Sequence, residues 1–349
     1  MTEKTDIKSL TLDELTESVT KMGLPKFRAS QIYSWLHKSF VTEFDEMTNI
    51  PVSLRQKLDY SFVIFNCAIE KKLVSQYDGT VKYLLRLNDG EFVETVVMRY
   101  KYGLSICVST QVGCKMGCKF CASTLGGCVR NLTASEILSQ VYTAQKDLEE
   151  RISHVVLMGM GEPLDNYKNV TKFLRLVSDE NGINIGMRNI TLSTCGLVPK
   201  IYDLIEEELQ LTLSISLHAP NDGIRNKIMP INHRYKISEL LKTCRDYTKA
   251  TNRRISFEYS LISGVNDSDE CARELSLILK GMLAHVNLIP VNEVDETNMK
   301  RSSDSRVKSF QNILVKNGIN ATIRRTLGND INASCGQLRR ASEKGGQTI

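Results

Sequence analysis

Apolar residues recur at helical spacing along the first sixty positions of the chain. Thr11 and Glu14 have the spacing of a capping box, which marks the start of a helix. The apolar stripe that follows consists of Leu12, Leu15, Val19 and Met22. Shorter stripes begin near Ile32 and after Pro51, where two more helices are expected. The pattern predicts a small N-terminal helical accessory domain over residues 1–60.

Over residues 61–100 the pattern changes to short segments separated by tight turns. Asp78-Gly79 and Asp89-Gly90 are dipeptides that two-residue hairpin turns prefer. Because β-rich segments flank both turns, we expect a short antiparallel β meander that links the helical unit to the rest of the chain.

From about residue 103, β-rich runs alternate with helical stretches. The runs cover residues 104–109, 154–158, 189–193, 211–217, 254–261 and 285–289. Six β-then-α units predict an α/β core over residues 101–340, built on a parallel sheet curled into a barrel or part of one. A doubly wound sheet is the alternative, but no GxGxxG follows the first run. Residues 341–349 are expected to form a flexible tail.

The composition is that of an ordinary globular protein, with 42% hydrophobic and 24% charged residues. No run of about 18 apolar residues occurs, so no membrane span is expected. The N-terminus lacks the apolar segment of a signal peptide. We therefore expect a cytoplasmic protein, in a compartment that keeps thiols reduced.

The net charge is only +5, but the basic residues are clustered. No acidic residue occurs between Thr95 and Ser135, although five Lys and Arg side chains do. Two more basic stretches lie at residues 225–236 and 324–340. Solvated surface would explain any one stretch. If all three converge on one site, they would suit a polyanionic substrate.

Five of the ten cysteines fall between positions 107 and 128, which in a reducing compartment indicates metal binding or catalysis. Cys114, Cys118 and Cys121 have the spacing CxxxCxxC, so a short loop can bring three thiolates to one side. Three ligands suit a four-iron cluster with one iron left open. A structural zinc site normally takes four ligands. A zinc knuckle that recruits Cys107 or Cys128 is therefore the alternative.

With Phe120 before its last cysteine, this loop resembles that of the radical S-adenosylmethionine superfamily. The segment Met158–Pro163, Met-Gly-Met-Gly-Glu-Pro, is similar to the one with which the superfamily holds the amino group of S-adenosylmethionine. Glycines let the backbone approach a ligand, and a carboxylate pairs with an ammonium group. The resemblance implies a partial (βα)6 barrel, S-adenosylmethionine as cofactor, and a [4Fe–4S] cluster on Cys114, Cys118 and Cys121.

A closer resemblance, to the bacterial adenine-C2 methyltransferases of 23S ribosomal RNA and certain tRNAs, extends over nearly the whole chain. The segments that carry it are 107–114, 121–127, 156–163, 216–221, 229–232, 264–267 and 328–337. One departure is Asp330-Ile-Asn332, where the family usually has Asp-Ile-Asp. The resemblance implies an RNA substrate, two S-adenosylmethionine molecules per turnover, and an electron-donor protein such as flavodoxin or ferredoxin.

The same resemblance implies catalytic roles for three residues. Cys335 would be methylated and would carry the carbon to the RNA base. Cys107 would then attack the sulfur of Cys335, and the transient disulfide would release methyladenine. Cys107 and Glu94 both match positions credited with taking the proton from the substituted carbon, and the sequence leaves that choice open. Without the resemblance, two buried core cysteines would be the simpler interpretation.

Seven positions match the family's contacts with S-adenosylmethionine. They are Gly161, Glu162, Ser193, Ser216, Leu217, His218 and Asn292. They lie at or just after the carboxyl ends of predicted strands, which is where a parallel barrel binds its ligand. His218 alone would more often be a structural histidine.

Three other functions are alternatives. A related enzyme methylates C8 of the same ribosomal adenine and confers antibiotic resistance, but it tends to have alanine where this chain has Pro163. A zinc-dependent RNA-binding module would bind RNA without catalysis. A glycyl-radical activating enzyme would share the cysteine loop but would give no reason for Cys335.

Overall fold

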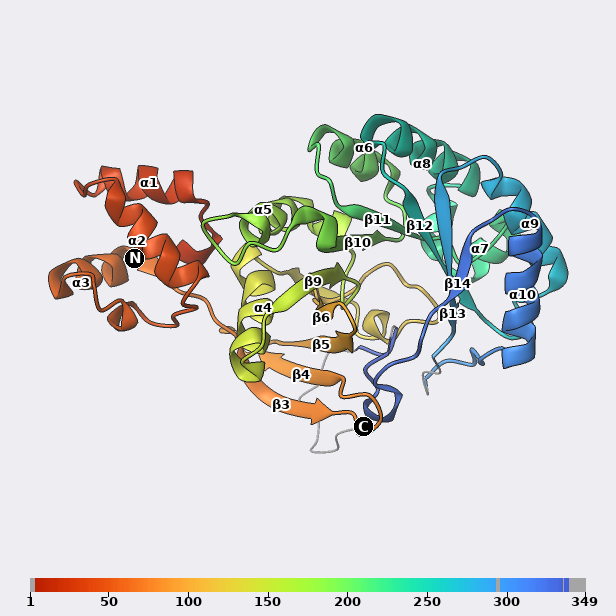
Figure 1. The fold of residues 1–349 in the computed structure, drawn as a ribbon, viewed down its shortest axis with the longest axis horizontal. Coiled ribbons are helices and arrows are strands. Elements are labelled where there is room, and N and C mark those ends of the chain that lie inside the picture. The colour runs from red at the N-terminus through yellow and green to blue at the C-terminus, as the bar shows by residue number, and fades with distance from the viewer. Residues whose placement is uncertain (1–3, 293–295, 335, 339–349) are drawn as a thin grey trace.

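The computed structural model describes residues 4–292, 296–334 and 336–338. Its N-terminal part consists of helices α1 (Leu12–Lys21), α2 (Phe27–His37) and α3 (Val52–Ser61), which lie together at one end of the molecule (Figure 1). The predicted capping box is present, because the Glu14 amide donates to Thr11 Oγ1 and the Thr11 amide to Glu14 Oε2. The short strands β1 (Thr5–Asp6) and β2 (Phe62–Val63) pair in parallel and join the two ends of this unit.

Among the described residues, ten strands form one curved sheet (Figure 1). In spatial order they are β14 (Ala321–Ile323), β13 (Ala284–Pro290), β12 (Ile255–Leu261), β11 (Thr212–Ser216), β10 (Ile190–Thr194), β9 (Ile152–Leu157), β6 (Gly103–Cys107), β5 (Phe92–Tyr100), β4 (Val81–Arg86) and β3 (Ala68–Val74). The six predicted parallel strands, β6 and β9 to β13, are neighbours in chain order, which confirms the partial barrel. The short β14 adds a seventh that the sequence did not indicate.

The antiparallel meander belongs to the same sheet as the barrel strands. β5 pairs with β6, and Val96 lies opposite Cys107. The C-terminal segment, which follows β14 at one edge of the sheet, contacts the meander at the other edge. The Gln76 amide donates to Asp330, and Lys82 Nζ donates to the carbonyl of Asn332. The meander therefore provides one wall against which the C-terminal segment packs.

The helices after the strands cover the outer face of the sheet (Figure 1). They are α4 (Ala134–Leu148), α5 (Tyr167–Ser178), α6 (Val198–Glu206), α7 (Asp222–Ile228), α8 (Ile237–Thr251), α9 (Asp269–Leu279) and α10 (Asp304–Lys316). Strand residues alternate accordingly: Ile190 and Leu192 are fully buried in the core, whereas Ser193 lines an inner cavity. The inner cavity is lined by both polar and apolar side chains and can hold a ligand. No helix in the described part of the chain is long and apolar enough to cross a membrane.

Candidate active site

A cavity of about 150 Å³ lies at the carboxyl ends of the barrel strands. It brings together nine of the residues that the sequence singled out: Cys114, Cys118, Cys121, Gly161, Glu162, Ser193, Ser216, His218 and Asn292. Leu217 is different, because its side chain is fully buried in the apolar core and does not line the cavity. Segments far apart in the sequence therefore converge where a parallel barrel binds its ligand.

The three cysteines lie on a loop between two short paired strands, β7 (Gln111–Gly113) and β8 (Cys128–Asn131). Burial raises the pKa of Cys114, and a bound metal cation would favour its thiolate. Within the described residues, no three His, Cys, Asp or Glu side chains converge as a single ion requires. A four-iron cluster binds each thiolate at a different iron. Three thiols that face one cavity suit such a cluster, with one iron left open.

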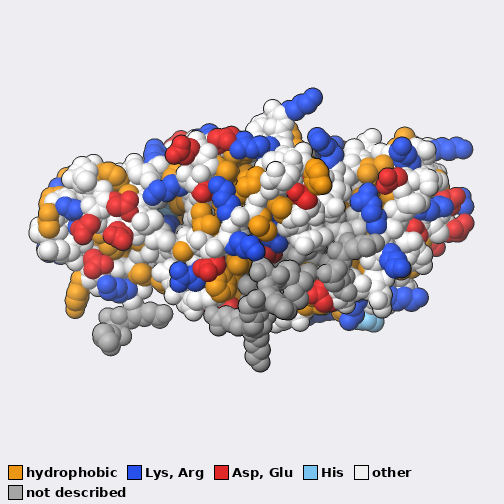
Figure 2. All heavy atoms as spheres, turned by 90° about the horizontal axis from the view of Figure 1, so that it is seen from below, with side chains coloured by type: hydrophobic (Ala, Val, Ile, Leu, Met, Phe, Trp, Pro, Cys, Tyr) orange, Lys and Arg blue, Asp and Glu red, His pale blue; other side chains and the backbone are white. Residues whose placement is uncertain are grey.

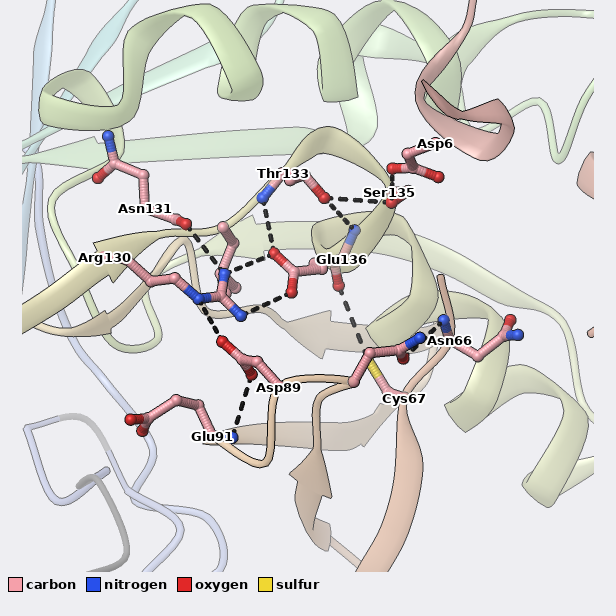
Figure 3. A network of polar contacts seen from close by, with 12 residues as sticks. Asp6, Asn66, Cys67, Asp89, Glu91, Arg130, Asn131, Thr133, Ser135 and Glu136 are labelled. Atoms are coloured by element: carbon pink, nitrogen blue, oxygen red, sulfur yellow. Dashed lines mark hydrogen bonds and ion pairs between the residues drawn. The ribbon is translucent and has the colours of Figure 1, made fainter. Parts of the chain in front are cut away.

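Arg130 anchors the pair of strands, β7 and β8, that carries the cysteine loop (Figure 3). Its guanidinium group donates two hydrogen bonds of 2.8 Å to Glu136 on α4 and one of 2.7 Å to Asp89 in the β4–β5 turn. Glu136 also forms a capping box with Thr133 at the start of α4. The network holds the cysteine loop against both the barrel and the meander.

The segment after β9 passes very close to the neighbouring backbone, which explains its glycines. A Cβ on Gly159 would lie 2.6 Å from the carbonyl oxygen of Val108. Gly161 has a φ of +103°, and a Cβ there would lie 2.7 Å from Cβ of Gln111. The close approach places the following carboxylate, Glu162, at the wall of the cavity.

Two backbone amides hold the Glu162 carboxylate in place. The amides of Leu164 and Cys195 donate to it at 3.0 and 2.8 Å. Burial raises the pKa of Glu162, although these hydrogen bonds oppose the rise. A buried carboxylate fixed in this way suits an ammonium group, which would compensate its desolvation.

His218 is neutral and has a defined tautomer. The Ser260 amide donates to its Nδ1 at 2.8 Å, so the proton of the neutral ring lies on Nε2. Burial lowers the pKa of His218 to about 3. Its ring contacts Phe120 of the cysteine loop edge-on, with centroids 4.8 Å apart. His218 therefore links the loop after β11 to the cysteine loop.

Sequence reasoning misjudged Arg225, which it had placed in a basic stretch suited to a polyanion. The side chain is fully buried. Its guanidinium group donates to the carbonyls of Leu217, Cys195 and Ser216 and to the side chain of Asn232. Arg225 thus organises the loops after β10 and β11, and its sequence neighbours gave no sign of this.

Other members of the predicted basic stretches are paired with acidic residues from elsewhere in the chain. Arg99 pairs with Glu150, and Lys115 with Asp165. On the face shown in Figure 2, Lys and Arg side chains are interspersed with acidic and hydrophobic ones. Sequence distance hides such long-range ion pairs, so a basic stretch does not by itself show which of its side chains remain available to a polyanion.

A second cavity, of about 30 Å³, adjoins the first. The two share the lining residues Met158, Ile289, Asn292 and Arg324. Cys107 lines the second cavity together with Ser334, and Gly336 lines the first. Cys335, the predicted methyl carrier, lies outside the described residues, but both of its neighbours face these cavities.

Glu94 lines neither cavity. Its carboxylate pairs with Lys82 Nζ at 2.7 Å, and Lys82 also donates to the carbonyl of Asn332. Glu94 therefore lies near the C-terminal segment. Sequence reasoning missed Glu258, which is buried inside the barrel, lines the first cavity, and pairs with Arg324 at 3.9 Å.

Comparison with known proteins agrees with this arrangement. Residues 108–275 match the radical SAM superfamily, and residues 5–64 match the N-terminal domain of ribosomal RNA large subunit methyltransferases. A protein of Clostridium novyi described as "probable dual-specificity RNA methyltransferase RlmN" is 57% identical, and the match covers 96% of this chain and 98% of that one. The chain belongs to the RlmN family of radical SAM methyltransferases.

Other relatives agree with this assignment to the RlmN family. A protein of the same description from Lachnoclostridium phytofermentans is 54% identical over 98% of this chain and 96% of its own. The crystal structure of a radical SAM methyltransferase from Sphaerobacter thermophilus superimposes with a TM-score of 0.92 at 43% identity, covering 96% of this chain and 99% of that one. As a member of the radical SAM superfamily, this RlmN-family enzyme uses a [4Fe–4S] cluster and S-adenosylmethionine.

Proposed function

We propose that this enzyme methylates C2 of a specific adenine in 23S ribosomal RNA and in certain tRNAs, in the cytoplasm. One observation carries the proposal: Cys107 and the residue before Cys335 line a cavity that adjoins the cofactor cavity. A methyl carrier must reach both the methyl donor and the RNA base. A segment between two adjoining cavities has the right position for that task.

Different residues of the cofactor cavity would bind the cluster and S-adenosylmethionine. Cys114, Cys118 and Cys121 would hold the cluster and leave one iron open. When bound, the cluster and S-adenosylmethionine supply the methyl group and the one-electron chemistry that an unactivated adenine carbon requires. Glu162 would pair with the amino group of S-adenosylmethionine, since its carboxylate is buried and already oriented.

The remaining contacts would orient the rest of S-adenosylmethionine. Ser193, Ser216 and Asn292 present polar side chains to the cavity, and His218 presents its Nε2 hydrogen. Leu217 would contribute through its backbone, because its side chain is buried in the core.

Two thiols would carry out the covalent steps. Cys335 would accept the methyl group by displacement and then bear the carbon that bonds to C2 of the adenine. Cys107 would attack the sulfur of Cys335, so that an S–S bond forms while the bond between that sulfur and the transferred carbon breaks, which leaves the carbon on C2 as a methyl group. The proton on C2 would go to Cys107 or to Glu94. An electron donor of the flavodoxin or ferredoxin class would restore the dithiol.

The domain division also belongs to this proposal. Residues 1–60 would be the accessory domain, residues 61–100 the link, residues 101–340 the catalytic core, and residues 341–349 a tail. The accessory domain would assist RNA binding, and the catalytic core would hold both cavities.

Position-specific labelling tests the proposed function. The anaerobically purified enzyme is incubated with methyl-labelled S-adenosylmethionine, a reductant and 23S RNA, and the RNA is then digested to nucleosides. We expect the label in 2-methyladenosine. Label in 8-methyladenosine would support the C8 alternative, and a colourless, zinc-containing protein that transfers no label would support the RNA-binding module.

A further inference from the structure

Three aromatic rings form a cluster at the junction of β5 and β6. Tyr100 ends β5, and Tyr102 lies in the turn that leads to β6. Their rings are stacked, with centroids 4.9 Å apart and an angle of 7° between the planes. His154 of β9 meets Tyr102 edge-on at 4.7 Å. The orientation of the Tyr102 ring is therefore fixed from two sides.

Despite these contacts, Tyr102 is 61% exposed. A large aromatic ring held in one orientation, yet open to solvent, adds little to the apolar core. Such a ring presents a flat, preformed surface, and a second flat group can stack on it without ordering a mobile side chain.

The cluster marks one end of the cavity that contains Cys107. Val96, Met98 and Tyr100 all line this cavity, because alternate residues of β5 face the same side. Val96 lies opposite Cys107, so the cavity runs along β5 from Cys107 toward the stacked rings. At about 3.3 Å per residue, four residues of strand separate the two ends by roughly 13 Å.

The surroundings of the stack are basic. Arg325 lines the cavity beside Tyr100 and is exposed, whereas Arg324, which also lines it, pairs with the buried Glu258. Lys101, between the two tyrosines, is exposed. Partial burial raises the pKa of Tyr102, and Arg324 is close enough to oppose the rise. Aromatic rings beside cations suit the flat bases and the phosphates of single-stranded RNA better than a protein surface.

We propose that Tyr100 and Tyr102 form a stacking platform for the RNA base next to the target adenine. The inference rests on the proposed function. An enzyme that reacts with a ring carbon must take the adenine out of its base stack, and the neighbouring base then loses a stacking partner. The exposed ring of Tyr102 replaces that partner, while the exposed Lys101 and Arg325 hold the adjoining phosphates.

Fluorescence of a modified RNA tests the platform. An RNA stem-loop containing the target adenine carries 2-aminopurine at the nucleotide on one side of it or the other, because stacking quenches this base. Wild-type enzyme, Tyr102→Leu and Tyr102→Phe are compared, with Leu277→Ala as the control. Leu277 lies on α9 and is 71% exposed, so the control removes exposed apolar surface elsewhere. Reductive cleavage of S-adenosylmethionine without RNA reports whether each variant is folded.

We expect the wild-type enzyme, Tyr102→Phe and Leu277→Ala to quench one of the two labelled positions. Tyr102→Leu should not quench it and should bind the RNA about tenfold more weakly. Quenching and affinity that are unchanged in Tyr102→Leu would overturn the platform, as would wild-type quenching at neither position. If the wild-type enzyme methylates the RNA and Tyr102→Leu has the same quenching and RNA affinity as the wild-type enzyme, the platform is refuted but the proposed function is not. If the wild-type enzyme does not methylate the RNA, the proposed function itself fails.

Discussion

Replacing Arg225 by Met should destabilise the protein and weaken cofactor binding together. Arg225 is fully buried and donates four hydrogen bonds of 2.8–3.1 Å, three of them to carbonyls in the loops after β10 and β11. Methionine has a similar shape, so Arg225→Met removes the donors and leaves little cavity. The carbonyls of Cys195 and Ser216 then lose the group that holds their loops together.

The magnitude follows from two opposing contributions. Each hydrogen bond from a charged donor contributes about 1.5–3 kcal/mol. Burial lowers the pKa of Arg225, which shows that the buried cation is itself costly, and its removal recovers part of that cost. We expect a net loss of about 3 kcal/mol in the free energy of unfolding. In urea this loss corresponds to a midpoint lowered by roughly 1 M or somewhat less.

Urea unfolding and equilibrium binding of S-adenosylmethionine measure the two effects. Arg273→Met is the matched control, because Arg273 is exposed on α9 and pairs across one turn with Glu270. We expect the control to shift the free energy of unfolding by less than about 1 kcal/mol. If Arg225→Met has the urea midpoint and the cofactor affinity of the wild-type enzyme, the organising role assigned to Arg225 is wrong.

Three further predictions concern the cluster, two buried histidines and salt. Cys114→Ala, Cys118→Ala and Cys121→Ala should each abolish cluster assembly, since three ligands leave none to spare; near-stoichiometric iron in any of them would contradict the assignment. Burial lowers the pKa of His37 and of His218 from an ordinary 6.5 to about 3. Between pH 6.5 and pH 3, these two histidines are therefore protonated in the unfolded chain but neutral in the folded chain. The free energy of unfolding should fall by about 1.4 kcal/mol for each histidine and each pH unit in this range. His37→Gln should have a flatter pH profile in urea unfolding, and profiles parallel to the wild-type one would refute this. RNA affinity should weaken steeply between low and physiological salt, because contacts with phosphates release counterions; an affinity independent of salt would exclude phosphate contacts.

The sequence predicted the barrel because its signals are local. Each strand is a short apolar or alternating run, as in residues 254–261, and β12 (Ile255–Leu261) forms almost where that run lies. The spacing of Cys114, Cys118 and Cys121 is equally local, since a short loop must bring the three thiols to one side. Both features follow from residues that are close together in the chain.

Features that depend on distant partners could not be predicted in this way. From the sequence, Arg225 is expected to be a surface cation. In the folded chain it is buried and donates hydrogen bonds to the carbonyls of Cys195 and Ser216. Arg99 likewise finds Glu150 only in the folded chain. The strand β14 is only three residues long, and it forms because β13 offers it an edge. These contacts join segments whose proximity only the fold creates.

The most direct test of the account is the fate of RNA on a Cys107→Ala variant. If Cys107 resolves the adduct, this variant should still transfer the carbon from Cys335 to the base but could not break the thioether that results. RNA should then accumulate in covalent linkage to the protein, as a nuclease-sensitive shift on a denaturing gel that disappears in the Cys107→Ala/Cys335→Ala double variant. Normal turnover by Cys107→Ala, with no crosslinked RNA, would contradict the resolving role proposed for Cys107.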